Sequence, residues 1–357
     1  MTILWVSLIL VFSFSIMARY FAVPAPMSVT YIQPNKILAA AAALVLMLVA
    51  GLRNNIGDTF LYMHAYEVNT LSWDTFYMQK DMGFVVLQLL LKQITEDPQI
   101  LIFTTAFITN MLIAIVLYKY SRLYELSMYV YITSGAFTVS MNGLRQFLAA
   151  AIIFAATKAL FDGRWKVFFS VVILASFLHQ SALIMLPIYF IVRRKAWTVS
   201  TFALLALAVA FVGGFEYISD LVFKVLQNTQ YGHYSEFDEG GANIIRVFVS
   251  GIPIFIAYLG RHKLREIFPE SDIVVNLSFV ALTLMIISTQ NWIFARMTIF
   301  FNLYVLILIG WLVKLFREKE QRLVYLGILS FYFIFYYFES VVSLGLYYSS
   351  DYITWFK

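Results

Sequence analysis

QILIFTTAFITNMLIAIVLY, residues 99–118, decides the fold class of this 357-residue chain. The stretch holds no Asp, Glu, Lys or Arg. An α-helix rises 1.5 Å per residue, so about 20 apolar residues cross the ~30 Å hydrocarbon core of a bilayer. The stretch therefore predicts a helix that spans a membrane.

The whole chain has the same character. Hydrophobic residues make up 62% and charged residues 13%, and the mean hydropathy is +0.81, whereas a soluble domain carries roughly 25% charged residues. We predict a single polytopic membrane domain over residues 1–357, an all-α bundle with about 12 transmembrane helices. Besides 99–118, the expected spans lie near 2–20, 37–52, 126–141, 143–161, 165–178, 182–192, 197–215, 247–260, 273–289, 297–313 and 323–347.

Composition also excludes several kinds of site. The chain has no cysteine, which excludes disulfides and thiolate metal sites, and its four histidines leave little room for zinc. We expect no metal and no cofactor. The net charge of +5 comes from short clusters between apolar runs, which indicate membrane topology and not nucleic-acid binding.

The basic residues predict an orientation. With the N-terminus outside and the spans alternating, the inner side holds 17 of the 25 lysines and arginines and the outer side 8. Acidic residues run the other way, with 7 of 20 inside and 13 outside. Because cytoplasmic loops are enriched in Lys and Arg, we predict that both termini are extracellular.

Two outer segments stand out. In the first, about 53–97, Met82–Ile94 is apolar but carries Gln88 and Lys92 on one helical face, and it is too short to span. We expect an amphipathic or partly re-entrant helix there. The second, about 216–246, is the longest outer loop. Its Glu236, Asp238 and Glu239 are read as a solvated face, with divalent-cation binding as the minority alternative.

Short spans predict a polar recess that opens outward. Helices over 164–178 and 182–192 would reach only about 22 Å and 17 Å, so the turn at His179 is expected below the outer surface. Polar backbone at that depth needs a protein-buried or water-lined cavity, and charges there point to function. The expected lining is Arg53, Asp58, Asn142, Arg145, Gln146, His179 and Arg296.

Structural alternatives stay open for three of these residues. For Arg145 the alternative is an ion pair with a carboxylate such as Asp58. His179 is explained by a hydrogen-bonded helix terminus. Arg296 is explained by snorkelling, in which its long side chain reaches the membrane interface.

The polar motifs, taken in order, resemble the EpsG family of bacterial multi-pass proteins from biofilm exopolysaccharide operons, which are related in kind to O-antigen polymerases. The resemblance covers nearly the whole chain. It is carried by Gly51-Leu52-Arg53-Asn54-Asn55-Ile56-Gly57-Asp58-Thr59 with Tyr62, Asp81-Met82-Gly83-Phe84, Asn142-Gly143-Leu144-Arg145-Gln146, His179-Gln180-Ser181-Ala182 and Phe294-Ala295-Arg296-Met297.

This resemblance implies polymerisation of oligosaccharides linked to polyprenyl diphosphate, at the outer face of the bacterial plasma membrane. Membrane lipids and other exopolysaccharide synthesis proteins are the implied partners. Asp58 or His179 is the expected general base, and the choice between them stays open. Residues expected to bind the diphosphate or glycan are Arg53, Asn54, Asn142, Arg145, Gln146 and Arg296, the arginines because their planar forks suit phosphate.

Three other functions compete with a polymerase. A flippase for lipid-linked oligosaccharides needs access from both faces and often carries internal repeats, and no repeat is visible. A membrane acyltransferase needs an acyl-donor site on the inner side and usually a catalytic histidine beside a carboxylate, and the one inner histidine, His262, lies in a basic loop. The third is a non-catalytic scaffold of the synthesis complex.

Overall fold

The computed structural model describes residues 1–69, 72–74, 80–215, 217 and 240–354. The chain divides into two compact units. Unit 1 comprises Met1–Leu183 and Ile309–Lys357, and unit 2 comprises Ile184–Leu308. Almost all regular structure in the described ranges is helical, which confirms the all-α class.

Unit 1 begins with α1 (Thr2–Tyr20), a short antiparallel pair of β1 (Val23–Pro24) and β2 (Ile32–Gln33), and α2 (Lys36–Gly51). Its other elements are α3 (Thr59–Val68), α4 (Met82–Lys92), α5 (Gln99–Tyr120), α6 (Tyr124–Thr133), α7 (Ala136–Asn142), α8 (Leu144–Ala155), α9 (Thr157–Phe161), α10 (Trp165–Ser176), η4 (Val313–Leu315), α19 (Glu318–Tyr337) and η5 (Phe338–Ser343). The chain passes between the units in η2 (Gln180–Ile184) and α18 (Ile299–Leu312).

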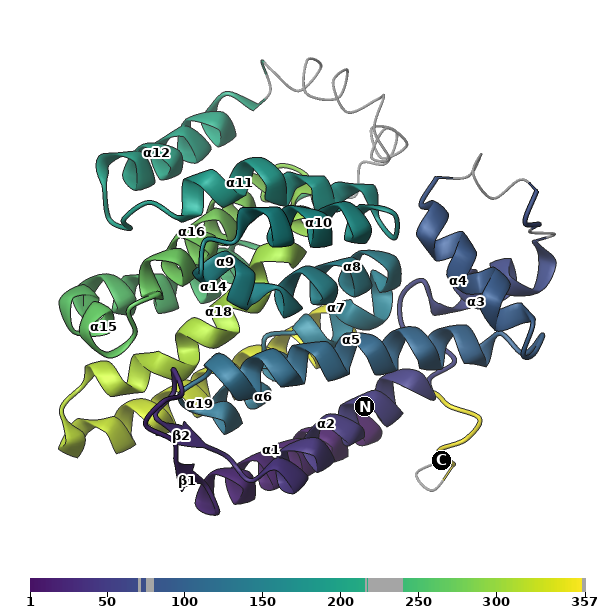
Figure 1. Ribbon diagram of the computed structural model, residues 1–357, viewed down its shortest axis with the longest axis horizontal. Coiled ribbons are helices and arrows are strands. Elements are labelled where there is room, and N and C mark those ends of the chain that lie inside the picture. Colours follow the sequence, from purple (N-terminus) through teal and green to yellow (C-terminus); the bar gives the residue numbers. More distant parts are fainter. Residues whose placement is uncertain (70–71, 75–79, 216, 218–239, 355–357) are drawn as a thin grey trace. The chain divides into compact units, whose positions relative to one another are not determined.

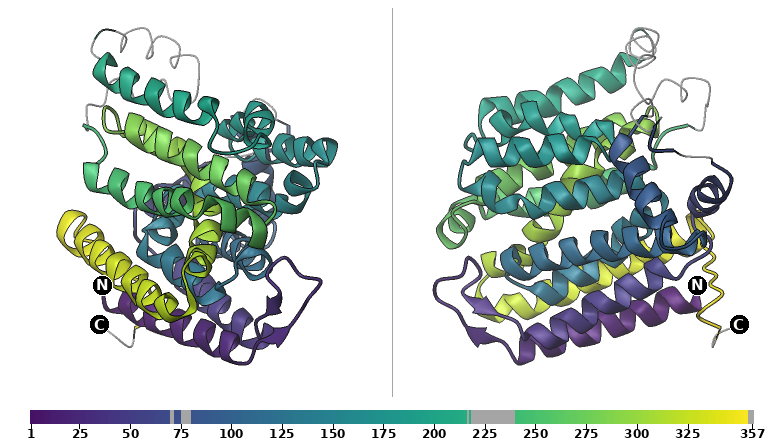
Figure 2. Two further views of the ribbon diagram at one scale, coloured as in Figure 1. Left: turned by 90° about the vertical axis from the view of Figure 1, so that its left-hand side faces the viewer. Right: turned by 45° about the vertical axis from the view of Figure 1, so that its right-hand side comes forward.

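Small residues let α2 lie close between α1 and α5 (Figures 1 and 2). The buried face of α2 is rich in alanine, and Ala42 and Ala50 are almost completely buried. At Gly51 an added Cβ would lie 2.7 Å from the Phe103 ring of α5, closer than carbon atoms can pack. Close backbone approach at small residues is how helices associate without a hydrophobic driving force from water.

The bonds between these helices define two ends of unit 1. At one end, Asn35 donates its backbone N–H to Ala18 O (2.8 Å), and Arg19 forms an ion pair with Glu125. At the opposite end of α2 and α5, Gln99 donates to Gly51 O (2.6 Å). The residues of the first four family motifs gather at this second end, which we call the motif end.

Three described helical segments are long and apolar enough to cross a bilayer: Thr2–Tyr20, Gln99–Tyr120 and Glu318–Ser343. A fourth arises if Ile244–Leu259 and Arg261–Ile267, bent by 82°, count as one span. The other apolar helices are shorter, with 10–17 residues. A helical membrane protein is therefore confirmed, and the count of about 12 crossings stays a prediction.

Two expected spans are broken in the structure. The stretch 126–141 divides into α6 and α7 at Gly135, whose φ of 83° lies in the left-handed region that favours glycine. The stretch 143–161 likewise divides into α8 and α9. Hydropathy does not reveal such breaks, because both halves remain apolar.

The segment 53–97 is more helical than expected. The amphipathic helix predicted from Met82 is confirmed as a helix, α4, which buries Phe84, Val85 and Leu89. The helix α3 within the same segment was not predicted, because its apolar residues lie among polar ones without a clear stripe.

Unit 2 is assembled around α16 (Ser271–Ile287), against which α11 (Met185–Val192), α12 (Val199–Gly213) and α14 (Ile244–Leu259) pack. Its remaining helices are α15 (Arg261–Ile267) and α17 (Ile293–Met297). Asn276 of α16 donates to Val192 O (3.0 Å) and Arg194 O (2.7 Å), which satisfies carbonyls at the end of α11. Most of the predicted loop 216–246, including Glu236, Asp238 and Glu239, lies outside the described residues.

Candidate functional site

Arg53 lies inside unit 1, with only 1% of its surface exposed. Its Nε donates to Thr59 Oγ1 (2.9 Å), its Nη2 donates to Met141 O (2.7 Å), and its Nη1 donates to Ala50 O. Burial lowers the pKa of this guanidinium to about 9, which still leaves it charged at neutral pH. This geometry favours a structural role in which Arg53 ties α2, α3 and α7 together, and its predicted role in binding diphosphate stays a prediction.

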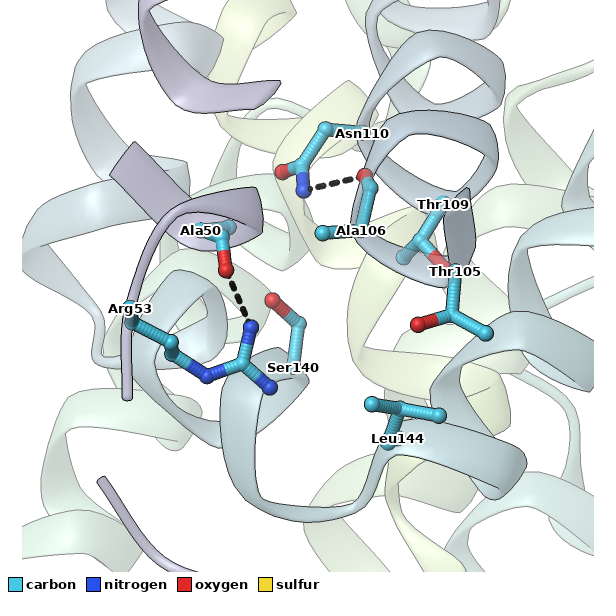
Figure 3. Close-up of a pocket in the computed structure, with 8 residues that line it drawn as sticks. All are labelled: Ala50, Arg53, Thr105, Ala106, Thr109, Asn110, Ser140 and Leu144. Atoms are coloured by element: carbon cyan, nitrogen blue, oxygen red, sulfur yellow. Dashed lines mark hydrogen bonds between the residues drawn. The ribbon is translucent and has the colours of Figure 1, made fainter. Parts of the chain in front are cut away.

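A small interior space adjoins Arg53 (Figure 3). Ser140 lies beside the guanidinium, and the α5 residues Thr105 and Asn110 lie across the space. The hydroxyls and amide mostly bond to backbone carbonyls of their own helices, as Asn110 does to Ala106 O (2.8 Å). The space is too tight to hold a water molecule, so we read it as a polar packing seam and not as a binding site.

Asn142 joins the third motif to the first. Its Oδ1 accepts a hydrogen bond from the backbone N–H of Asp58 (3.0 Å), the residue before α3. The preceding Gly57 has a φ of 55°, and an added Cβ would lie 2.3 Å from Asn142 Oδ1. Only glycine tolerates both the positive φ and the lack of space for a Cβ atom, which explains why this motif residue is glycine.

Arg145, in the first turn of α8, forms an ion pair with Asp81. Nη1 donates to Asp81 Oδ2 at 2.8 Å, and Nε donates to the Tyr62 hydroxyl at 3.4 Å. The guanidinium also lies over the rings of Tyr62 and Phe84, at 5.7 and 5.8 Å from their centroids. The carboxylate in this pair is thus Asp81, whereas the sequence had suggested Asp58.

Asp81 also connects the second motif to the fourth. Its Oδ1 accepts from the backbone N–H of Gln180 (3.3 Å), and the N–H of Gly83 donates to Phe177 O (2.7 Å). Burial raises the pKa of the Asp81 carboxyl, and the nearby Arg145 charge opposes that rise. Sequence reasoning placed Asp81 in a motif but not in the site, and its carboxylate type was the available signal.

His179 lies just after α10, where its backbone N–H donates to Ala175 O (3.1 Å). Its Nδ1 is 2.6 Å from Ser181 Oγ, and the buried Gln146 donates its Nε2 to the same oxygen (3.4 Å). The structure therefore brings the predicted residues His179 and Gln146 together through Ser181.

A cavity of about 340 Å³ opens between α3, α4 and the start of α8. Of the predicted site residues, Asp58 and Arg145 line it. Lys80 and Asp81 line it as well, so two carboxylates and two cations share one cavity with apolar and aromatic side chains. The full lining is Asp58, Leu61, Tyr62, Ala65, Asn69, Lys80, Asp81, Phe84, Val85, Gln88 and Arg145.

Two predicted residues lie elsewhere. Asn54 bonds through its side chain to the hydroxyl of Ser349, near the C-terminus. Arg296 lies in α17 of unit 2, with its guanidinium 4.9 Å from the Trp292 ring centroid. Its place beside the residues of unit 1 stays a prediction.

No group of three or more His, Cys, Asp or Glu side chains in the described part of the chain is arranged to hold a metal ion. The charged residues that line the cavity are an arginine, a lysine and two aspartates. These groups suit binding of a charged phosphate group and proton transfer.

The helices and the cavity define a polytopic membrane protein with a charge-lined site at one end of unit 1. The EpsG family model matches residues 36–353, and the chain belongs to the EpsG family. Membership implies a polymerase-like role in exopolysaccharide biosynthesis. None of the curated proteins and none of the solved structures matches the chain.

Proposed function

We propose that this protein polymerises oligosaccharide repeat units, carried on polyprenyl diphosphate, into exopolysaccharide at the outer face of the bacterial plasma membrane, and so supports biofilm matrix formation. The observation that carries the proposal is the cavity in which Arg145 and Lys80 lie with Asp58 and Asp81. Its mixed lining suits a substrate with a charged diphosphate, polar sugars and an apolar chain.

The reaction we propose is glycosyl transfer. An acceptor sugar hydroxyl attacks the anomeric carbon of the donor, the bond from that carbon to the diphosphate oxygen breaks, and the hydroxyl proton passes to a base. Negative charge then develops on the leaving diphosphate, where a fixed cation in a water-poor site stabilises it best. Arg145 is held against Tyr62 and Phe84 at this cavity, and we assign it that role.

We assign the base to Asp58. Asp58 lines the cavity, whereas His179 is not among the lining residues. Asp81 also lines it, but its oxygens accept from Arg145 and from the Gln180 N–H, which favours a role in orienting the arginine. Lys80 is the second cation available to a diphosphate, which carries two phosphate groups.

The proposal includes an outward motif end, about 12 crossings, and both termini outside. Two observations support it. First, four motifs meet at one end of unit 1. Second, Arg19 pairs with Glu125 at the other end, and the distribution of basic residues predicts that Arg19 lies on the cytoplasmic side. A site gathered at one end favours an enzyme over a flippase, which needs access from both faces. Other synthesis proteins and membrane lipids remain the proposed partners.

The decisive experiment follows lipid-linked intermediates in cells that lack the protein or carry Arg145→Lys. A polymerase defect should leave single repeat units on the outer leaflet. Single units held on the inner leaflet would instead indicate a flippase, and normal long polymer from the Arg145→Lys protein would refute the diphosphate role.

A further inference from the structure

The chain returns to the first motif at its C-terminal end. After η5, Gly345 adopts a φ of 52°, and Leu346 donates its backbone N–H to Ser340 O (2.8 Å). This tight turn redirects the chain, so that residues 346–350 run alongside the end of α2 and the loop that follows it (Figure 1).

Two motif asparagines bind this returning segment. The Asn55 side chain donates to Tyr347 O (2.6 Å) and accepts from the Ser349 N–H (2.7 Å). The Asn54 N–H donates to Ser349 O (3.1 Å), and the Asn54 side-chain oxygen accepts from the Ser349 hydroxyl. Backbone N–H and C=O groups of one short stretch are thereby bound, as a neighbouring strand would bind them.

The same segment satisfies the end of α2. The Tyr348 hydroxyl donates to Val49 O (2.8 Å), and the Ser350 hydroxyl donates to Leu52 O (2.5 Å). The last carbonyls of a helix have no partner within the helix, so these bonds act as a cap supplied from almost 300 residues away. Tyr348 and Ser350 are 5% and 3% exposed, so water is largely kept from these bonds.

We infer that Asn54 and Asn55 recognise the chain's own C-terminal segment, and that this contact positions the loop carrying Asp58. We call residues 346–350 and their bonds to Val49–Asn55 the C-terminal clamp. Asn54 adjoins the buried Arg53, and the same loop ends at Asp58, whose N–H is held by Asn142. The clamp and Asn142 therefore hold the loop at two points.

This inference rests on the proposed function for its effect on catalysis, but the clamp itself does not. It assigns Asn54 a positioning role in place of the substrate-binding role that its motif suggested. A positioning residue should alter the transfer rate more than substrate affinity, because it moves Asp58 without touching the lipid-linked sugar.

The first test measures the clamp without any substrate. Ser350→Cys adds the one thiol of a cysteine-free chain at a position 3% exposed. That thiol should react slowly with maleimide in membranes. Adding Ser349→Ala or Asn54→Ala should speed the reaction by about 3- to 10-fold, the effect expected from losing one hydrogen bond. Ser349→Thr keeps the hydroxyl and is the matched control. Equal reactivity in all four proteins would overturn the clamp.

The second test is a double-mutant cycle on transfer by purified protein. Asn54→Ala and Ser349→Ala should each lower kcat, leave KM nearly unchanged, and together do no more than either alone, because both remove one contact. If KM rises in Asn54→Ala but not in Ser349→Ala, Asn54 binds the substrate and its positioning role is wrong. If the cysteine variants show the expected thiol reactivities but the cysteine-free protein shows no transfer, the proposed function fails and the clamp stands.

Discussion

The Nη1 atom of Arg145 lies 2.8 Å from the Oδ2 atom of Asp81, and this ion pair joins two motifs that are 64 residues apart in the chain. The Asp81 side chain is 6% exposed and that of Arg145 is 38% exposed. A nearly buried carboxylate thus holds a half-exposed guanidinium at the cavity, which leaves the cation reachable by a ligand.

Removing the charge of Asp81 from its ion pair with Arg145 should destabilise the protein. Asp81→Asn leaves Arg145 without its charged partner, and because Arg145 is half exposed we expect a loss of about 1–2 kcal/mol, less than for a fully buried pair. Adding Arg145→Gln should restore the yield of folded protein but not transfer. Thermal unfolding in detergent measures the first effect. An unchanged Tm in the Asp81→Asn protein would remove Asp81 from this role.

The two arginines at the motif end should respond differently to lysine. Arg145→Lys should fold normally but transfer about 10- to 100-fold more slowly, because lysine keeps the charge and loses the planar fork. Arg53→Lys should instead reduce the amount of folded protein, since one ammonium cannot reach Thr59, Ala50 and Met141 in the same geometry. Size-exclusion profiles and polymer length separate the two outcomes. If both variants fold equally well and both transfer slowly, Arg53 binds the substrate and its structural role is wrong.

Removing the proposed base, Asp58, should slow the glycosyl-transfer step without affecting folding or substrate binding. Asp58→Asn should leave protein level and lipid-substrate binding intact while transfer falls on the order of 10²–10⁴-fold. His179→Gln keeps hydrogen-bonding ability without proton transfer at neutral pH, and it should slow transfer far less. Single-turnover rates with a defined lipid-linked substrate decide the matter. Loss of transfer in His179→Gln alone would move the base to His179.

Glycine substitutions test the junction of the first and third motifs. Gly57→Ala combines a φ of 55° with a contact of 2.3 Å to Asn142, so we expect a loss of several kcal/mol, about 3 or more. Gly135→Ala is the matched control. Its φ is 83° but no atom lies within 4 Å of an added Cβ, so only the backbone cost of about 1–2 kcal/mol applies. Similar Tm values for the two variants would contradict the packing at Gly57.

Orientation is tested with single cysteines on opposite sides. Glu96→Cys, before α5 at the motif end, should react with an impermeant maleimide in intact cells. Met27→Cys, at a fully exposed position in the turn between β1 and β2, should react only after lysis. The reverse pattern would invert the layout, because the basic bias places residue 27 inside and residue 96 outside.

Local features were predictable from sequence. The run at 99–118 became α5, because a chain in lipid must satisfy its backbone within one helix. Family membership was likewise visible in the order of short motifs, and the match over residues 36–353 confirms it. The helix from Met82 followed from its apolar pattern.

The pairing of side chains was decided only by the tertiary structure. Both Asp58 and Asp81 were visible as carboxylates, but the approach of α4 to α8 selects Asp81 as the partner of Arg145. The sequence predicted that Arg53 binds diphosphate, and only the structure shows the three acceptors that surround its guanidinium. Sequence periodicity reports which face of a helix is apolar, whereas an ion pair or a cap depends on where remote backbone lies. For that reason the composition and motifs of this chain determined its class and family, and packing alone brought Ser349 to Asn54 and Asp81 to Arg145.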